Sequence, residues 1–389
     1  MAKAPDADRT LLVDGNRLTF LPEGPERFER LMALIDGAKK SLRLLYYIFT
    51  GDASGDAVRD ALMRALDRGV AVSLLIDGFG SGHTHEAYFR ELHERGATFC
   101  RFNPSYGRRY LLRNHQKLAL ADSETKSCRI LIGGFNVEDS YFGTVADGAW
   151  RDVGLLVEGP AAARVEAYYD ALMAWALKPR SRLKTLRTVV RTHSESEGPL
   201  QWLYGGPMQL KSPWGLATLR DLAAAKDLEM IVGYFAPMGG VLRRIGAIAA
   251  RGRARIMIPA KSDNRQTIDA ARSTYARLLK RRVQIYEYQT TKLHSKLLIM
   301  DDVVHIGSSN FDLRSLYLNM EMMLRVDDPE FAQLMRNYFE HEVGGCLEIT
   351  PAVYKEQATL LQRIKWRIAW FLVASLDYTV TRRLAMRAP

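Results

Sequence analysis

Two stretches of the chain carry the same chemically active residues at the same spacing. Each reads His-x-Lys-x4-Asp: His115, Lys117 and Asp122 in the first copy, and His294, Lys296 and Asp301 in the second. The apolar alternation around both stretches is typical of strands, where residues i and i+2 point to one face. We therefore expect each histidine to lie beside its lysine. The imidazole would attack or transfer a proton, and the lysine would hold negative charge.

A second pattern follows each motif after another expected strand. It reads Gly133-Gly134-Phe135-Asn136 in the first copy and Gly307-Ser308-Ser309-Asn310 in the second. A glycine turn has little bulk and the asparagine supplies an amide, so this pattern is suited to holding phosphate oxygens. The two histidines are 179 residues apart, and two matching constellations at that separation favour a shared function over chance.

Each copy also has an acid downstream, Asp152 in the first and Glu321 in the second. A carboxylate on the far nitrogen of an imidazole fixes its tautomer and raises its basicity. We favour this orienting role over the alternative of a surface acid that follows a strand.

Several other chemistries are disfavoured. Each motif offers one histidine with no cysteine nearby, which is a poor zinc site. The Gly-x-Ser-x-Gly elbow of serine hydrolases is missing. The glycines at 78, 80 and 82 lack the spacing of a dinucleotide-binding loop. We therefore expect neither a metal nor a cofactor.

The elements that must position these residues are themselves duplicated. The first half predicts, in order, a helix over 28–40, a strand over 41–49, a helix over 55–68, a strand over 70–76, a helix over 86–95 and a strand over 97–102. The second half predicts a helix over 216–226, a strand over 228–235, a helix over 240–250, a strand over 254–259, a helix over 274–281 and a strand over 283–288. We take Tyr46 and Tyr234 as equivalent residues of the two halves.

Alternating strands and helices predict an α/β fold with a mostly parallel or mixed sheet in each half. Two such halves suggest a pseudo-twofold molecule whose site lies at the shared face. We expect the first half over residues 1–177, a basic connector over 178–199, the second half over 200–350 and a basic helical segment over 351–389. The connector is either a solvated run or an anion-binding stripe.

The composition points to an anionic partner. The 389 residues include 55 Lys and Arg against 44 Asp and Glu, which gives a formal charge of +11 and a pI near 9.5. Nucleic acid, acidic lipid headgroups and phosphorylated substrates all remain possible on this ground. Arg108, Arg109 and Arg113 lie just before His115, where they would meet an anionic substrate or form a solvated loop.

The C-terminal segment contains the longest candidate for membrane contact. Residues 368–376 are mostly apolar and are too few to span a bilayer, which takes about 20 residues. Basic residues flank them, and Trp366, Trp370 and Tyr378 add rings that settle at headgroup depth. The alternative is a terminal helix docked on the core. The first ten residues have no apolar run, so we expect no signal peptide.

The paired motif resembles the phospholipase D superfamily, over roughly residues 20–350. Several stretches are similar to bacterial cardiolipin synthases, namely residues 47–49, 75–81, 150–152, 157–160, 234–237, 258–263 and 286–289. The chain resembles the shorter, peripheral members most. It departs from the pattern in having Gly134 where the second copy has Ser308, so one hydroxyl contact to phosphate is missing from the first half.

The resemblance implies two α-β-α sandwich halves with one active site at their interface. It implies a metal-independent, two-step transfer in which His115 attacks the phosphodiester and His294 acts as general acid and base. The lysines, Asn136, Asn310 and Ser308 would bind the phosphoryl oxygens, and Asp152 and Glu321 would orient the histidines. Asp122 and Asp301 would support the motifs structurally.

We therefore expect a phosphatidyltransferase of cardiolipin synthase type acting on phosphatidylglycerol or a similar phospholipid. The alternatives are a phospholipase D-type hydrolase, a nuclease of the same superfamily and an inactive binding scaffold. The expected partner is an anionic membrane surface, on the cytoplasmic face of the cell membrane, and nucleic acid is not the leading substrate. The oligomeric state is left open.

Overall fold

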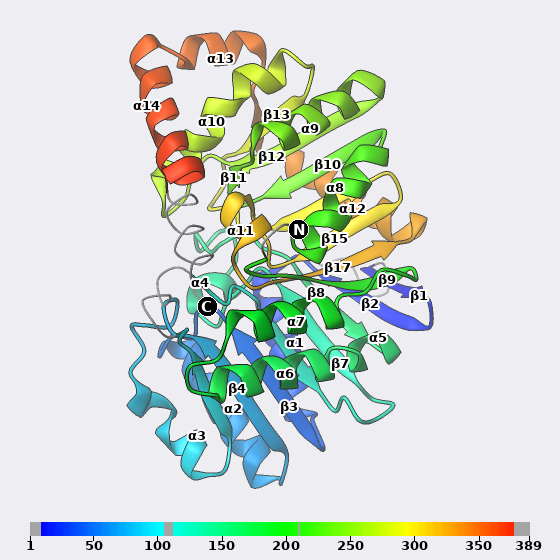
Figure 1. Ribbon diagram of the computed structural model, residues 1–389, viewed down its shortest axis with the longest axis vertical. Coiled ribbons are helices and arrows are strands. Elements are labelled where there is room, and N and C mark those ends of the chain that lie inside the picture. Colours follow the sequence, from blue (N-terminus) through cyan, green and yellow to red (C-terminus); the bar gives the residue numbers. More distant parts are fainter. Residues whose placement is uncertain (1–8, 105–111, 209–210, 377–389) are drawn as a thin grey trace.

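The computed structural model describes residues 9–104, 112–208 and 211–376 (Figure 1). The strands of the first half are β1 Thr10–Val13, β2 Asn16–Leu21, β3 Ser41–Tyr46, β4 Ala71–Asp77, β5 Thr98–Phe102, β6 Leu118–Ala121, β7 Arg129–Gly133 and β8 Gly154–Glu158. Those of the second half are β9 Leu200–Gly205, β10 Asp227–Val232, β12 Arg253–Pro259, β13 Gln284–Tyr288, β14 Lys296–Met300, β15 Val303–Gly307, β17 Glu321–Asp327 and β18 Cys346–Glu348. The short strands β11 Phe235–Ala236 and β16 Phe311–Asp312 pair with each other.

The helices alternate with these strands. The first half contains α1 Gly24–Asp36, α2 Ala53–Asp67, η2 Glu86–Phe89, α3 Arg90–Glu94, α4 Asp139–Phe142, α5 Pro160–Ala163 and α6 Glu166–Leu177, and α7 Leu183–His193 lies in the connector. The rest of the chain contains α8 Pro213–Ala224, α9 Gly239–Arg251, α10 Arg265–Leu279, α11 Leu313–Tyr317, α12 Pro329–Val343, α13 Pro351–Gln357, α14 Leu360–Trp370 and η4 Phe371–Leu376.

The duplication predicted from the sequence is confirmed by the order of the strands. The two eight-stranded sheets share the series β2-β8-β7-β6-β3-β4-β5 and β9-β17-β15-β14-β10-β12-β13. In each series the last three strands are parallel and the others antiparallel. Figure 1 shows the first half below and the second above. The α/β fold with two similar halves is therefore confirmed, and each sheet is mixed.

The strand register corrects one expected equivalence. Ser41 and Asp227 start β3 and β10, and each accepts the backbone N–H of the aspartate that ends its motif. Counting from these residues, Tyr46 corresponds to Val232 and not to Tyr234. Tyr46 is buried in the core, whereas Tyr234 lies beyond the end of β10.

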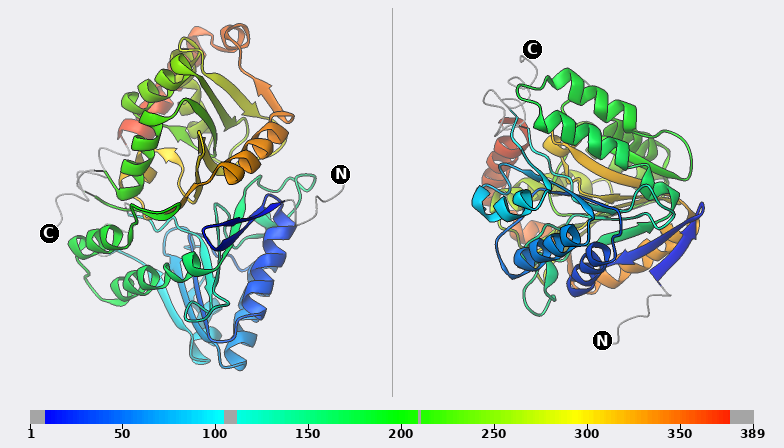
Figure 2. Two further views of the ribbon diagram at one scale, coloured as in Figure 1. Left: turned by 90° about the vertical axis from the view of Figure 1, so that its right-hand side faces the viewer. Right: turned by 90° about the horizontal axis from the view of Figure 1, so that it is seen from below.

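One apolar core is shared by both halves. It takes side chains from one face of each sheet together with those of α6, α7 and α12. The strands after the two motifs alternate between cores: Leu118 and Leu120 of β6 join the shared core, and Ala119 and Ala121 face the helices of their own half. The two halves are thus packed as one unit, which Figure 2 shows from the side and from below.

Two segments differ from the sequence-based expectation. Helix α10 begins at Arg265, nine residues earlier than expected, because Asn264 caps it by accepting the N–H of Gln266. The basic connector is largely the helix α7, whose Leu183, Leu186 and Val190 are buried in the shared core. It is therefore not merely a solvated run, and the alternative of an anion-binding stripe stays a prediction. We retain, as a proposal, the division of the chain into residues 1–177, 178–199, 200–350 and 351–389.

The C-terminal helix α14 packs along α10, and it ends in η4 (Figure 1). Trp366 is buried against Tyr354, which fits the alternative of a terminal helix docked on the core, and Tyr378 lies outside the described residues. Within residues 9–104, 112–208 and 211–376, no helix combines the length and apolar character needed to cross a membrane.

Candidate active site

Backbone hydrogen bonds join the two halves at both histidines. The N–H of His115 donates to the carbonyl of Met320 at 2.9 Å, and the N–H of His294 donates to the carbonyl of Arg151 at 2.8 Å. Each of these hydrogen bonds belongs to an isolated parallel β-bridge. One bridge joins Asn114 to Met320, and the other joins Leu293 to Arg151. The bridges therefore place each acid directly beside the histidine of the opposite half.

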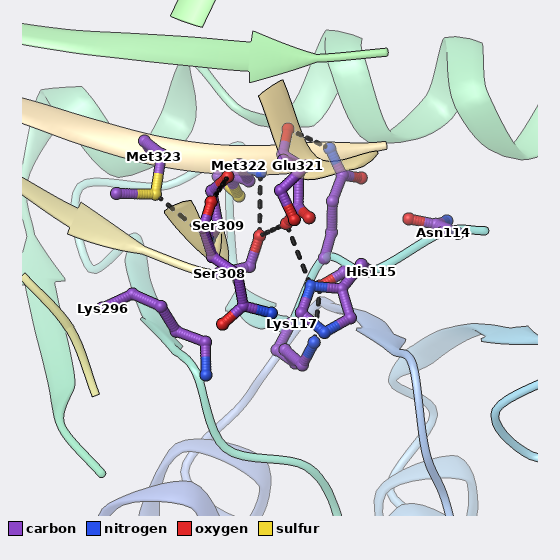
Figure 3. Close-up of polar contacts among 12 residues, drawn as sticks. Asn114, His115, Lys117, Lys296, Ser308, Ser309, Glu321, Met322 and Met323 are labelled. Carbon is purple, nitrogen blue, oxygen red and sulfur yellow. Dashed lines mark hydrogen bonds and ion pairs between the residues drawn. The ribbon is translucent and has the colours of Figure 1, made fainter. Parts of the chain in front are cut away.

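Both imidazoles are held by a carboxylate from the opposite half. His115 Nδ1 lies 3.1 Å from Glu321 Oε2 (Figure 3), and His294 Nδ1 lies 2.7 Å from Asp152 Oδ2. Both acids are fully buried. The sequence predicted the acids but not which histidine each would serve. Because Nδ1 is engaged in both rings, Nε2 is the nitrogen left for chemistry.

The two histidines line one cavity of about 490 Å³ between the halves. Its wall also includes both expected asparagines, the cationic Arg113 and Arg314, and apolar or aromatic side chains. The main lining residues are Tyr47, Arg113, His115, Asn136, Tyr141, Trp150, Tyr234, Asp263, His294, Asn310, Asp312, Arg314, Leu372 and Val373. The two imidazoles, the two expected amides and the two guanidinium groups offer hydrogen-bond donors to an anionic, partly apolar substrate, beside the carboxyl groups of Asp263 and Asp312.

The lysines lie behind the histidines. Both His-Lys pairs stand at the entry to a strand and not within it as expected, since β6 begins at Leu118 and β14 at Lys296. Lys117 Nζ donates to the carbonyl of its own His115 at 2.6 Å, and Lys296 Nζ donates likewise to His294. Burial lowers the pKa of both lysines, that of Lys296 to about 8. An arriving anion would favour their charged form.

The electrostatic environments of the two histidine–acid pairs differ. Burial and the neighbouring lysines lower the pKa of both histidines, that of His294 to about 3. Burial raises the pKa of Glu321 to about 8. Asp152 is equally buried, but Lys296 and His294 outweigh the effect of burial and hold its pKa below the ordinary value. His294 thus faces an ionised carboxylate, whereas His115 faces one that takes up a proton readily.

The two asparagines occupy matching places in the cavity wall. Asn136 Oδ1 accepts the backbone N–H of Ile48 at 3.1 Å, which leaves its NH₂ group to donate.

Gly133 and Gly307 end the strands that precede the two asparagines, and a Cβ at Gly307 would lie 2.2 Å from the carbonyl oxygen of Met322. Glycine is therefore required there for the close approach of the neighbouring strand.

Ser308 departs from its expected role as a phosphate ligand. Its hydroxyl donates to Glu321 Oε2 at 2.5 Å and accepts the N–H of Met322 at 3.1 Å (Figure 3). At the matching position, a Cβ on Gly134 would lie 2.6 Å from Asp152 Oδ1. The Ser308 hydroxyl is thus accommodated beside Glu321, whereas Asp152 Oδ1 lies too close to position 134 for any side chain there. We assign Ser308 a positioning role.

The motif aspartates lie away from the cavity. Asp122 accepts the backbone N–H groups of Lys39, Lys40 and Ser41, and Asp301 accepts those of Lys226 and Asp227. Both residues have positive φ, +54° and +51°, at the turn after their strand. They tie that turn to the start of the neighbouring strand and do not reach the histidines.

Aromatic rings around the histidines are the main feature that sequence reasoning missed. The Tyr47 ring lies 5.0 Å from His115, and Trp150 and Tyr141 lie 5.2 and 5.3 Å from His294. Tyr47 and Trp150 belong to the stretches 47–49 and 150–152 that were singled out from the sequence without a role for these rings, whereas Tyr141 stands in no recognisable pattern. Of the expected arginine approach, Arg113 lines the cavity, and Arg108 and Arg109 lie outside the described residues.

Nothing in the described ranges suggests a metal centre, since no three His, Cys, Asp or Glu side chains there are grouped to hold an ion.

Comparison with known proteins places the chain in one family. The family described as "Cardiolipin synthase, PLD-like domain" matches residues 31–173 and 219–343, which are the two halves.

Curated relatives agree over most of the chain. A cardiolipin synthase of Listeria monocytogenes is 29% identical over 364 residues, which cover 90% of this chain and 74% of the relative. The major cardiolipin synthase of Bacillus subtilis is 30% identical over 376 residues, covering 92% and 74%. Among solved structures, a phosphatidylserine synthase of Haemophilus influenzae has the same fold, with a TM-score of 0.70 and 15% identity over 94% of this chain and 95% of that one.

Proposed function

The chain belongs to the phospholipase D-like cardiolipin synthase family, and on this premise we propose that it transfers a phosphatidyl group from one phospholipid to an alcohol on another. The observation that carries the proposal is the convergence of two His-Lys pairs, one from each half, on a single cavity. Two imidazoles, each held at Nδ1 by a carboxylate, supply a nucleophile and a proton carrier, which are the two groups that a double displacement at phosphorus needs.

In the first step, His115 Nε2 attacks the phosphorus of the donor phospholipid. The bond from phosphorus to the headgroup oxygen breaks as the nitrogen–phosphorus bond forms, and His294 gives a proton to the departing alcohol. Burial and Lys296 lower the pKa of His294, and the ionised Asp152 at 2.7 Å is the contribution that opposes this and favours the imidazolium form. This is the reason for keeping His294 as the acid and His115 as the nucleophile.

In the second step, the acceptor alcohol replaces the headgroup. Its oxygen forms a bond to phosphorus while the nitrogen–phosphorus bond breaks, and its proton passes to His294. Lys117, Lys296, Asn136 and Asn310 would stabilise charge on the phosphoryl oxygens during both steps. No cofactor is required for the atoms or charges to balance.

The C-terminal helix supports a membrane location for this reaction. Leu361, Ile364 and Ile368 of α14 are exposed by 79, 47 and 56% on one face, opposite the buried Trp366 and Ala369. Exposed Arg363, Lys365 and Arg367 lie among them. An apolar row beside cations complements an anionic phospholipid surface.

The same row leads toward the active site. Phe371 is also exposed, and the following Leu372 and Val373 line the catalytic cavity. A lipid entering from a membrane under α14 would therefore keep its chains against apolar side chains while its headgroup reaches the histidines. We propose that α14 and η4 lie on an anionic membrane surface, on its cytoplasmic side.

Incubation of the purified protein with phosphatidylglycerol vesicles, and separately with single-stranded DNA, tests the proposal. Formation of cardiolipin and glycerol supports it, with a His115→Asn variant as the inactive control. Phosphatidic acid as the only lipid product would assign hydrolysis instead. Cleavage of DNA without lipid turnover would overturn the lipid substrate.

A further inference from the structure

A second cavity, of about 560 Å³, lies beside the catalytic one. Its walls come from the start of α10, the segment before His294 and helix α14. Its lining residues are Gly148, Ala260, Lys261, Ser262, Arg265, Ile268, Asp269, Arg272, Thr290, Thr291, Lys292 and Lys365. Five of them are cationic and one is acidic.

The two cavities share their walls. Ser262, Arg265 and Ile268 face the second cavity, and the intervening Asp263, Asn264, Gln266 and Thr267 line the catalytic one. Lys292 lines the second cavity two residues before His294, and its Nζ lies 5.0 Å from the centre of the Trp150 ring. Trp150 in turn contacts the His294 imidazole. The second cavity is therefore a direct neighbour of the reacting centre.

Part of its positive charge is not neutralised by the protein. Arg272 pairs with Glu287 at 2.8 Å, and Lys365 pairs with Asp269 at 3.0 Å. Lys261, Arg265 and Lys292 have no carboxylate within ion-pair distance among residues 9–104, 112–208 and 211–376. Three such cations around one cavity favour an anionic ligand with several acceptor oxygens.

We propose that this cavity binds the phosphodiester of the acceptor phospholipid. This inference rests on the proposed function. The donor phosphorus occupies the space between the histidines, and an acceptor such as phosphatidylglycerol carries its own phosphate at the other end of a three-carbon headgroup. When the acceptor hydroxyl oxygen bonds to phosphorus and releases the histidine nitrogen, that second phosphate needs a cationic site close by. Lys261, Arg265 and Lys292 supply it.

The experiment compares two radiolabelled soluble acceptors, glycerol and glycerol 3-phosphate, with unlabelled phosphatidylglycerol as donor. The rate is read as label entering the lipid, because transfer to glycerol regenerates phosphatidylglycerol. Arg265→Gln is the test variant, because Arg265 is exposed and lies outside the catalytic cavity. Arg277→Gln, on the same helix and also exposed, is the matched control. We expect the KM for glycerol 3-phosphate to rise about tenfold to a hundredfold in Arg265→Gln, as for one lost charge-assisted hydrogen bond. The KM for glycerol and the control variant should be unchanged.

Equal changes for the two acceptors, or no change for either, would overturn the acceptor site. In that case continued transfer to glycerol by all the proteins would leave the proposed function standing. Failure of the wild-type protein to transfer to either acceptor or to release the headgroup would instead remove the proposed function, and this inference with it. Lys261→Gln should also raise the KM for glycerol 3-phosphate selectively. Because Lys261 lies outside α10, this result would show that the effect of Arg265→Gln comes from a lost cation and not from damage to the start of that helix.

Discussion

His294 Nδ1 lies 2.7 Å from Asp152 Oδ2, although the two residues are 142 positions apart and belong to different halves. The exchange is reciprocal, since Glu321 of the second half serves His115 of the first. Each half therefore supplies one histidine and the acid for the other. Neither half contains a complete histidine–acid pair, so both pairs are assembled only when the halves dock.

Asp152→Asn is expected to lower kcat by about a thousandfold to ten-thousandfold, because an amide keeps the shape but neither fixes the productive tautomer nor stabilises the imidazolium. The change is measured as the rate of cardiolipin formation from phosphatidylglycerol. The KM should move little. Asp302→Asn, an exposed substitution beside the second motif, should leave kcat unchanged. A loss below about tenfold in Asp152→Asn would contradict the orienting role.

Glu321→Gln is expected to change the pH dependence of stability. The pKa of Glu321 is raised to about 8 in the folded protein, so the fold binds a proton that the unfolded chain releases near pH 4.5. The raised pKa therefore stabilises the fold fully below about pH 4.5, and this stabilisation is lost as the pH rises from about 4.5 to 8. The melting temperature of the variant, relative to the wild type, should rise across that window. A difference that does not vary with pH would show that Glu321 is ionised throughout.

Asp122→Asn is expected to destabilise the fold by about 1–3 kcal/mol. The uncharged Oδ1 accepts the backbone N–H groups of Lys39, Lys40 and Ser41 more weakly than a carboxylate oxygen does, and Nδ2 cannot accept the second contact from Lys39. The kcat of the folded protein should stay within about threefold of the wild type. Denaturant unfolding and steady-state kinetics measure the two effects separately. A large fall in kcat with unchanged stability would show that this aspartate takes part in catalysis.

Ser308→Ala is expected to lower kcat by about tenfold and to leave the KM nearly unchanged. The serine hydroxyl donates to Glu321 Oε2, so its loss acts through the orientation of His115 and not through substrate binding. The ratio of kcat to KM effects is the readout. A rise in KM, or weaker inhibition by inorganic phosphate, would restore Ser308 as a phosphate ligand.

Replacement of Leu361, Ile364 and Ile368 by Asn should abolish co-sedimentation with anionic vesicles. These side chains are exposed, so the fold and the turnover of a soluble short-chain substrate should persist. The substitution is a sharper test than removal of the segment, because deletion would also uncover the α10 surface that Trp366 and Ala369 cover. Unchanged vesicle binding would place the membrane contact elsewhere.

The duplicated sheets were predictable because both halves repeat apolar strand and helix patterns in the same order. The acids Asp152 and Glu321 were predictable from matched positions. Their exchange between halves was not, since it depends on how the halves dock. The hydrogen bond from Ser308 to Glu321 was not predictable for a related reason: it depends on the neighbouring strand β17, which approaches so closely that only Gly307 fits before Ser308.

At the C-terminus the sequence left open whether the segment lies on a membrane or docks on the core. Trp366 is buried beside Tyr354, whereas the aliphatic row Leu361, Ile364 and Ile368 is exposed. The connector was read as charge alone, although its buried leucines and valines follow a helical repeat. In both segments, the face that packs is decided by a partner distant in sequence.

Trapping of the covalent intermediate tests the central claim most directly. A phosphatidyl ester of p-nitrophenol, whose leaving group departs without a proton, is mixed with His294→Ala and with His115→Ala, and each reaction is stopped in alkaline denaturant. The account predicts a burst of one nitrophenolate per His294→Ala molecule, with the phosphatidyl group on the peptide that contains His115, and no labelled peptide from His115→Ala. Label on His294 in the His115→Ala protein, with none in His294→Ala, would contradict the assignment of the nucleophile. No label in either protein would contradict the phosphohistidine mechanism.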